Sequence, residues 1–220
     1  MNLTTLINTA KNELSDLSEQ AGTLLYSSAA SVQKGDVYFL GFNPGGINGV
    51  SFKDNLALLP SKTSNSYLDE EWENDAGSWA AGESPLQKRV QWLFESLNLQ
   101  TKDICASNLI FFQSKQASEI NYNLADRCWP VHEQILRIVQ PKVILTFGNS
   151  GTSPYSYLYQ KFGSNTKQEM INSGHGDWSL KAFSTTINNI DTIIIGLPHL
   201  SRYSPIGKNF VIEWIRNRVY

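Results

Sequence analysis

Two asparagines and one histidine stand where their side chains could act together on a bound ligand. Asn43, Asn108 and His199 each lie within or shortly after a short apolar run of the sequence. An asparagine amide both donates and accepts hydrogen bonds but is no strong base, so it positions a ligand or a water molecule. An imidazole can donate a hydrogen bond to an oxygen that becomes negative during a reaction. These residue types predict chemistry that depends on positioning and on hydrogen bonds to developing charge.

The elements that would position these residues follow from the apolar runs. Buried strands are expected at 36–40, 104–112, 142–147 and 192–197, with 178–187 as a candidate for an extra strand. Helices are expected within 3–30 and at 84–97, 130–139 and 208–218. Continuous apolar strands separated by helices are typical of a parallel sheet that is covered on both faces. The expected fold class is therefore α/β, with three α/β/α layers and a central four-stranded, mainly parallel sheet.

In such sheets ligands bind beyond the carboxyl ends of the strands, so the loops after Gly41, Asn108 and Leu197 form the expected site. We expect residues 1–220 to form one domain, because no repeat or linker divides the chain. The polar segment 60–83 is expected to be a surface insertion.

The composition excludes several classes of protein. Apolar residues make up 41% of the chain and charged residues 17%, which allows a sizeable core, and the net charge of −2 argues against a protein that coats nucleic acid through a broadly basic surface. Two cysteines, Cys105 and Cys128, are too few for a disulfide framework, a zinc ribbon or an iron–sulfur cluster, and we expect no metal and no cofactor. The first residues are amphipathic and unlike a signal peptide, and no apolar run approaches the roughly 18–20 residues that span a bilayer. We therefore expect a cytoplasmic monomer with no membrane partner.

Three segments together resemble the uracil-DNA glycosylase superfamily. The run 41–45 (GFNPG) resembles the G-x-N-P-G loop of the mismatch-specific and single-strand-selective branches, and 49–52 (GVSF) resembles the later G-x-x-F. Asn108 within ICASNLIFF is the second match, and 199–204 (HLSRYS) stands in the place of the H-P-S-P-x-x loop. Order and spacing fit across about residues 35–215.

The resemblance implies an enzyme that hydrolyses the bond between a flipped-out pyrimidine and its sugar. Asn43 would hold the attacking water, and His199 would donate a hydrogen bond to the O2 oxygen of the departing base. Asn108 would form hydrogen bonds with the edge of the pyrimidine. Its amide suits uracil, because it can donate to O4 and accept from N3–H, and it also suits cytosine, because the amide can turn over and accept from the amino group. Phe52 would stack on the base. The base-binding set implied by the resemblance is Asn108, Phe52, Phe42 and Gly41.

The other two histidines are weaker candidates for the role of His199. His132 lies in an expected helix, where we expect it on the surface. His175 lies in an SGHG loop and could contact the ligand, but it belongs to no motif.

The loop after His199 would also contact DNA. The resemblance implies that Ser201 and the loop amides hold a phosphate, and that Tyr203 is the wedge that fills the gap left by the flipped nucleotide. Arg202 or Lys208 would add a phosphate contact. Leu200 departs from the resemblance, because a proline normally follows the histidine and makes this loop rigid.

Gly45 and Gly46 are a second departure. Strict uracil enzymes have a tyrosine here that blocks the C5 side of the pyrimidine, so the pocket should be open toward C5. The substrate would then be uracil, an oxidised or hydroxymethylated pyrimidine, or a more heavily modified base such as those of phage DNA. The role would be DNA repair or defence against phage.

Three functions remain open from the sequence. The first is a monofunctional DNA glycosylase that leaves an abasic site, without β-elimination, because no motif-matched lysine is available for a Schiff base. The second is a non-catalytic nucleic-acid-binding module with the same fold, which the mild acidity and Leu200 favour slightly. The third is an unrelated nucleotide-binding α/β enzyme that uses the Gly-rich loop for phosphate, although the sequence has neither glycine pattern typical of such loops.

Overall fold

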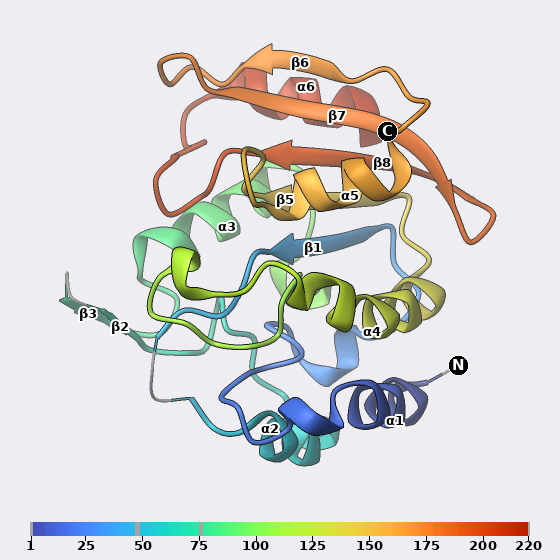
Figure 1. Cartoon of the computed structure of the whole chain (residues 1–220). Helices are drawn as coiled ribbons and strands as arrows, with labels where there is room; N and C mark the ends of the chain where they lie inside the picture. The colour runs from blue at the N-terminus through green and yellow to red at the C-terminus, as the bar shows by residue number, and fades with distance from the viewer. Residues whose placement is uncertain (1, 47–48, 75–76, 220) are drawn as a thin grey trace.

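A six-stranded sheet with helices on both faces forms the body of the molecule (Figure 1). The computed structural model describes residues 2–46, 49–74 and 77–219. The helices are α1 (Leu3–Glu13), α2 (Phe52–Leu58), α3 (Pro85–Ser96), α4 (Leu124–Val139), α5 (Pro154–Phe162) and α6 (Asn209–Val219). The strands are β1 (Val37–Gly41), β2 (Trp72–Asn74), β3 (Gly77–Trp79), β4 (Cys105–Asn108), β5 (Val143–Phe147), β6 (Glu169–Asn172), β7 (Ser179–Ile187) and β8 (Ile190–Leu197). Short 3-10 helices lie at Ser15–Leu17, Ala29–Ser31, Leu59–Ser61, Thr101–Asp103 and Ala117–Glu119.

The strand order of the large sheet is β4-β1-β5-β8-β7-β6. The first four strands are parallel and match the four expected apolar runs, while β7 and β6 extend the sheet in antiparallel fashion. The sheet therefore has six strands and not four. The candidate strand at 178–187 is β7, which returns into β8 through a tight turn at Asn188 and Asn189, both with positive φ. The pattern missed β6 because this edge strand is largely exposed and carries no apolar run.

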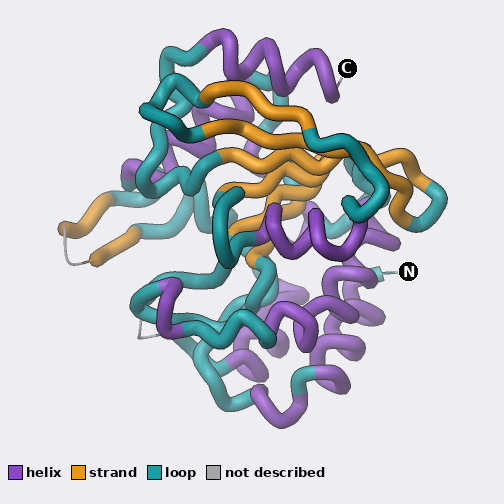
Figure 2. Tube along the Cα trace, turned by 45° about the horizontal axis from the view of Figure 1, so that its top comes forward, coloured by secondary structure: helices purple, strands orange, loops and turns teal. Residues whose placement is uncertain are grey.

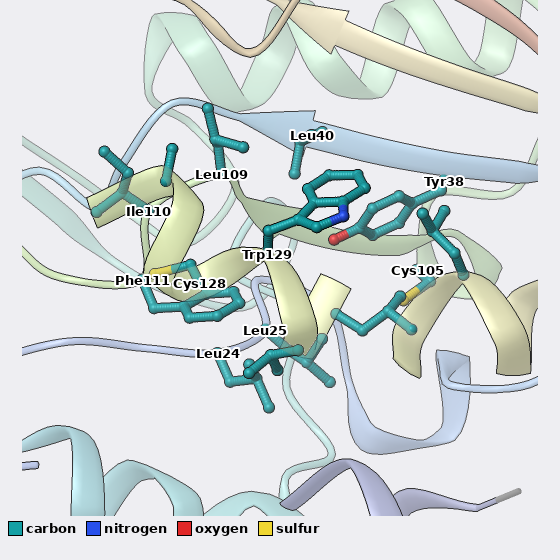
Figure 3. Packing of buried hydrophobic residues seen from close by; sticks show 14 of the residues in the cluster. Leu24, Leu25, Tyr38, Leu40, Cys105, Leu109, Ile110, Phe111, Cys128 and Trp129 are labelled. Carbon is teal, nitrogen blue, oxygen red and sulfur yellow. The ribbon is translucent and has the colours of Figure 1, made fainter. Parts of the chain in front are cut away.

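The parallel strands are buried on both faces, as their continuous apolar sequences predict. Along β1, Tyr38 and Leu40 point into one core cluster, which also contains residues of α1, α4 and α5. Val37 and Phe39 point into a second cluster with residues of α3 and α6. Figure 2 shows the helices on both sides of the strands, and Figure 3 shows part of the first cluster around Tyr38 and Trp129. The fold is thus α/β with a mainly parallel sheet between two helical layers.

Two helices illustrate what local sequence does and does not determine. Helix α3 begins as expected, because Ser84 Oγ accepts a hydrogen bond from the Gln87 amide (3.3 Å) and the Gln87 side chain accepts one from the Ser84 amide (2.9 Å). Helix α4 begins at Leu124, well before the expected start at Pro130, which lies inside it. The proline is tolerated there although it removes one backbone hydrogen bond.

Two other segments differ from expectation. Strand β4 ends at Asn108, and 109–112 leaves the sheet while remaining buried, with the amides of Leu109 and Ile110 donating to Gly41 O (2.8 Å) and Phe42 O (2.9 Å). The segment 60–83 is a surface insertion only in part: its β2–β3 hairpin projects from the body of the molecule (Figure 1), whereas Tyr67 is buried. Within the described ranges, no helix is long and apolar enough to cross a membrane.

Candidate active site at the carboxyl edge of the sheet

The three polar residues singled out from the sequence lie at one edge of the sheet. Asn108 is the last residue of β4, Asn43 follows the end of β1 by two residues, and His199 follows the end of β8 by two residues. These strands are parallel and only β5 separates β1 from β8, so their carboxyl ends share an edge. The expected placement of the three residues at this edge is confirmed.

The side chain of Asn43 is held in one orientation. Its Nδ2 donates to Pro44 O (2.9 Å), to Ser114 Oγ (2.8 Å) and more weakly to Phe112 O (3.4 Å). Carbonyl oxygens can only accept, and the Ser114 hydroxyl gives its own proton to Gln116 O (2.8 Å), so the NH₂ group must face these atoms. The Oδ1 of Asn43 therefore points away from them. It has no hydrogen-bond partner among the described residues and is free to accept one from water.

Asn108 is buried, with 3% of its surface exposed, and its amide lies against Gly41. A Cβ atom at Gly41 would overlap Oδ1 of Asn108 and lie 2.6 Å from Cζ of Phe147, so only glycine leaves room for both side chains. The Nδ2 of Asn108 is buried without a hydrogen-bond partner in the described part of the chain. An unpaired buried donor lowers the stability of the fold by roughly 1–3 kcal/mol. This penalty is explained if a ligand supplies the missing acceptor.

His199 is set up as a neutral hydrogen-bond donor. Its Nδ1 accepts from the Ser201 amide (3.2 Å) and lies 2.7 Å from the Ser201 hydroxyl. A backbone N–H can only donate, so Nδ1 is unprotonated and the ring proton sits on Nε2. Burial, and secondarily the charge of Arg202, lower the pKa of His199 to about 4. The ring packs edge-on against Phe147 (5.4 Å between centroids), and Cδ2, next to Nε2, faces Gly148 at the end of β5.

The loop after His199 is held firmly although it lacks the proline that the resemblance led us to expect. Leu200 is fully buried in the second core cluster. Arg89 of α3 donates from one nitrogen to the carbonyls of Leu200 (2.6 Å) and Ser201 (2.9 Å). The amide of Tyr203 donates back to His199 O (2.9 Å). Packing and hydrogen bonds thus supply the order that a proline ring would otherwise give.

Tyr203 does not occupy the position of a wedge. It is fully buried, its hydroxyl donates to Ser173 O (2.9 Å), and the ammonium of Lys208 lies 4.3 Å from the centre of its ring. That ammonium also donates to Ser204 O (2.6 Å). The prediction that Tyr203 fills the gap in DNA is therefore wrong for this conformation, and Lys208 serves to hold the loop.

The aromatic residues proposed for base stacking lie in the core. Phe52, at the start of α2, is fully buried between Phe111 (5.8 Å) and Phe112 (5.3 Å). Phe42 is also buried and packs near Tyr122 (6.1 Å). A base cannot reach a ring that is enclosed on all sides, so the stacking role of Phe52 needs correction.

His132 is not on a helix surface. It is fully buried, with Nδ1 at 2.9 Å from the Tyr38 hydroxyl and Nε2 at 3.0 Å from Leu109 O. Burial lowers its pKa to about 4, so it is neutral. Leu109 directly follows Asn108, and His132 therefore helps to fix the chain where it leaves β4. His175 packs edge-on against Trp178 (4.7 Å between centroids).

Sequence reasoning missed the residues that hold the loop after β1. Gln113 donates to Gly45 O (2.6 Å) and accepts from the Gly49 amide (2.8 Å), so its side chain bridges both sides of this loop. Ser114 orients Asn43, as described above. Both lie far along the chain in a segment without periodicity, and only the contact between this segment and the loop identifies them. A Cβ atom at Gly45 would meet no atom of the described residues within 4 Å, so the space beside it is open.

A cavity of about 570 Å³ lies next to the loop after His199. It is bounded by β3, the start of α3 and the loop, and none of Asn43, Asn108 or His199 lines it. Ser201 and Arg202 are exposed nearby on the same loop. Residues that line the cavity include Trp79, Lys88, Arg89, Ser204 and Ile206.

A comparison of the chain with models of known protein families and with curated proteins finds no match.

Proposed function

We propose that this protein is a monofunctional DNA glycosylase, with a fold of the uracil-DNA glycosylase type, that releases a pyrimidine base and leaves an abasic site. The observation that carries the proposal is the complementary set of groups at one sheet edge. Asn43 offers an acceptor oxygen, Asn108 a buried donor without a partner, and His199 a donor fixed at Nε2. The four parallel strands that place these residues support the same fold assignment.

The chemistry follows from these groups. A water oxygen attacks C1′ of the sugar, the bond from C1′ to the base nitrogen breaks, and its electron pair moves into the base. The negative charge that develops on O2 of the base receives a hydrogen bond from His199 Nε2. Because the pKa of His199 is about 4, the imidazole acts as a neutral donor and does not transfer a proton. Asn43 Oδ1 orients the water, whose proton passes to solvent, and the departing anion takes a proton from solvent.

DNA would be held by a few local contacts. Ser201 and Arg202 are exposed on the loop that carries His199, and they would contact a phosphate next to the flipped nucleotide. The net charge of −2 fits such local contacts better than broad nucleic-acid binding.

The substrate we favour is a C5-modified pyrimidine, because the space beside Gly45 is open. Such bases arise through oxidation and occur in the modified DNA of phages, so repair and defence are both compatible roles. We also propose that the protein acts in the cytoplasm as a monomer.

The test is base release from oligonucleotides that carry uracil, 5-hydroxymethyluracil or other modified pyrimidines, revealed by alkaline cleavage of the abasic site. Asn43→Ala should lose most base release while DNA binding persists, because Asn43 acts on the water and not on phosphates. His199→Ala should lose roughly 10²–10³-fold, the usual effect of removing one donor to a developing oxyanion. Asn217→Ala, on the exposed surface of α6, is the matched control and should behave like the wild type.

Unchanged turnover in Asn43→Ala would remove Asn43 from the mechanism. DNA binding without release of any base from the panel would favour a non-catalytic binding module instead.

A further inference from the structure

The strand order sets the order of polar groups along the edge. His199 follows β8, Asn43 follows β1, and Asn108 ends β4, the outermost parallel strand. Beyond β4 lies the segment that contains Tyr26, whose amide donates to Ala106 O of β4 (2.8 Å). Ala106 and Asn108 are two residues apart on one strand and face the same side of the sheet. Tyr26 therefore flanks Asn108 on the side away from His199.

The ring of Tyr26 is fixed by the insertion. It packs against Tyr67 (5.7 Å between centroids) and Trp72 (6.4 Å), and its carbonyl accepts from the Ser66 amide (2.7 Å). Residues 60–83 thus hold the ring and backbone of Tyr26 in place, so this insertion helps to shape the site.

An aromatic series joins Tyr26 to the rest of the site. Tyr67 contacts Phe39 (5.7 Å), Phe39 stacks on Phe147 (4.9 Å), and Phe147 contacts His199 (5.4 Å). These rings lie on the face of the sheet onto which the Asn108 side chain projects. Tyr26 and His199 are therefore at opposite ends of one wall.

The Tyr26 hydroxyl lies beside Asn108 and Gly45. Burial raises the pKa of Tyr26, and the nearby Asn108 side chain and Gly45 backbone act in the opposite direction. Two buried polar atoms in this region, Asn108 Nδ2 and the Tyr67 hydroxyl, have no hydrogen-bond partner among the described residues. A ligand that enters the open space beside Gly45 could pair with the nearby Asn108 amide.

We propose that Tyr26 is a specificity-determining residue that faces C5 of the bound pyrimidine and forms a hydrogen bond with a polar substituent there. The inference rests on the proposed function. If O2 of the base lies at His199 and the N3–C4 edge lies at Asn108, the next ring atom beyond Asn108 is C5, which is where Tyr26 stands. A hydroxymethyl group can pair with the phenol, whereas a methyl group leaves the phenol without a partner.

The experiment uses Tyr26→Phe, which keeps the ring and removes only the hydroxyl. The values of kcat/KM for release of 5-hydroxymethyluracil and of uracil are compared in oligonucleotides of one sequence. The ratio of the two should fall roughly 10- to 100-fold in Tyr26→Phe, with uracil release little changed. Tyr159→Phe, a half-buried tyrosine on α5, is the matched control and should keep the wild-type ratio.

An equal ratio in wild type and Tyr26→Phe would overturn the inference and leave the proposed function intact. Binding of the same two bases in uncleavable 2′-fluoroarabino oligonucleotides separates the two ideas further. If the wild type releases no base, yet prefers the hydroxymethyl analogue and loses that preference in Tyr26→Phe, the proposed function fails and the role of Tyr26 stands. If neither release nor binding distinguishes the bases in the wild type, Tyr26 does not read C5.

Discussion

Gly41→Ala adds one methyl group at the point where the site is most crowded. The new Cβ would overlap Oδ1 of Asn108 and lie 2.6 Å from Cζ of Phe147, well inside van der Waals contact. Phe147 is enclosed by Phe39 and His199, so the amide of Asn108 has to move, by an ångström or more. A displacement of about 1 Å of a group at a reacting site lowers the reaction rate on the order of 10²-fold. We therefore expect kcat/KM for base release to fall roughly 10²-fold, with an unfolding cost of roughly 1–3 kcal/mol from overpacking.

The matched control is Gly45→Ala, because a Cβ at Gly45 has open space and should leave release of uracil, which has no C5 substituent, close to that of the wild type. Urea unfolding of both variants separates a damaged site from a damaged fold. A double-mutant cycle completes the assay: if Gly41 acts through Asn108, adding Gly41→Ala to Asn108→Ala should cause little further loss of activity. Additive losses, or wild-type activity in Gly41→Ala, would refute this account of why a glycine ends β1.

The remaining predictions concern pH and the pocket. In the folded protein His132 and His199 have pKa values of about 4, whereas the ordinary value is 6.5. The unfolded chain therefore binds protons at a higher pH than the folded protein does. The free energy of unfolding should fall as the pH drops from about 6.5 to about 4, by up to roughly 3 kcal/mol for each histidine. Urea titrations across this range measure the effect, and a constant free energy would contradict it. Base release should show no His199 titration near pH 6.5 and should decline only toward pH 4, since the imidazole already works as a neutral donor; an inflection near 6.5 in the pH–rate profile would disprove this. Gly45→Tyr should abolish release of C5-substituted bases and spare uracil, and equal selectivity in both proteins would mean that the space beside Gly45 is not where C5 lies.

The parts of the fold that depend on local pattern could be predicted from the sequence. The four parallel strands are continuous apolar runs, and the start of α3 is marked by Ser84, Pro85 and Gln87, which form a complete cap. The edge that gathers Asn43 and His199 follows from the parallel order of the strands.

Side-chain direction could not be predicted, because it depends on packing partners from distant segments. The resemblance predicts Tyr203 to be a wedge, yet its ring is buried in the core and its hydroxyl donates a hydrogen bond to Ser173 O. Phe52 is likewise predicted from the resemblance to stack on a base, but it is enclosed by Phe111 and Phe112. A sequence motif can predict where the backbone lies, but the orientation of each ring depends on the residues that pack against it.

The loop after β8 shows how a departure from a motif can be offset elsewhere in the chain. A proline restricts the backbone before folding, whereas Leu200 gains its order only in the folded state, through burial and through the two hydrogen bonds from Arg89 to its own carbonyl and that of Ser201. Arg89 sits on α3, which packs on the same core as β8, so the position of His199 depends on the docking of a helix and not on the loop alone. Leu200 is therefore no argument against a working site, and the non-catalytic alternative loses one of the two sequence features that favoured it slightly.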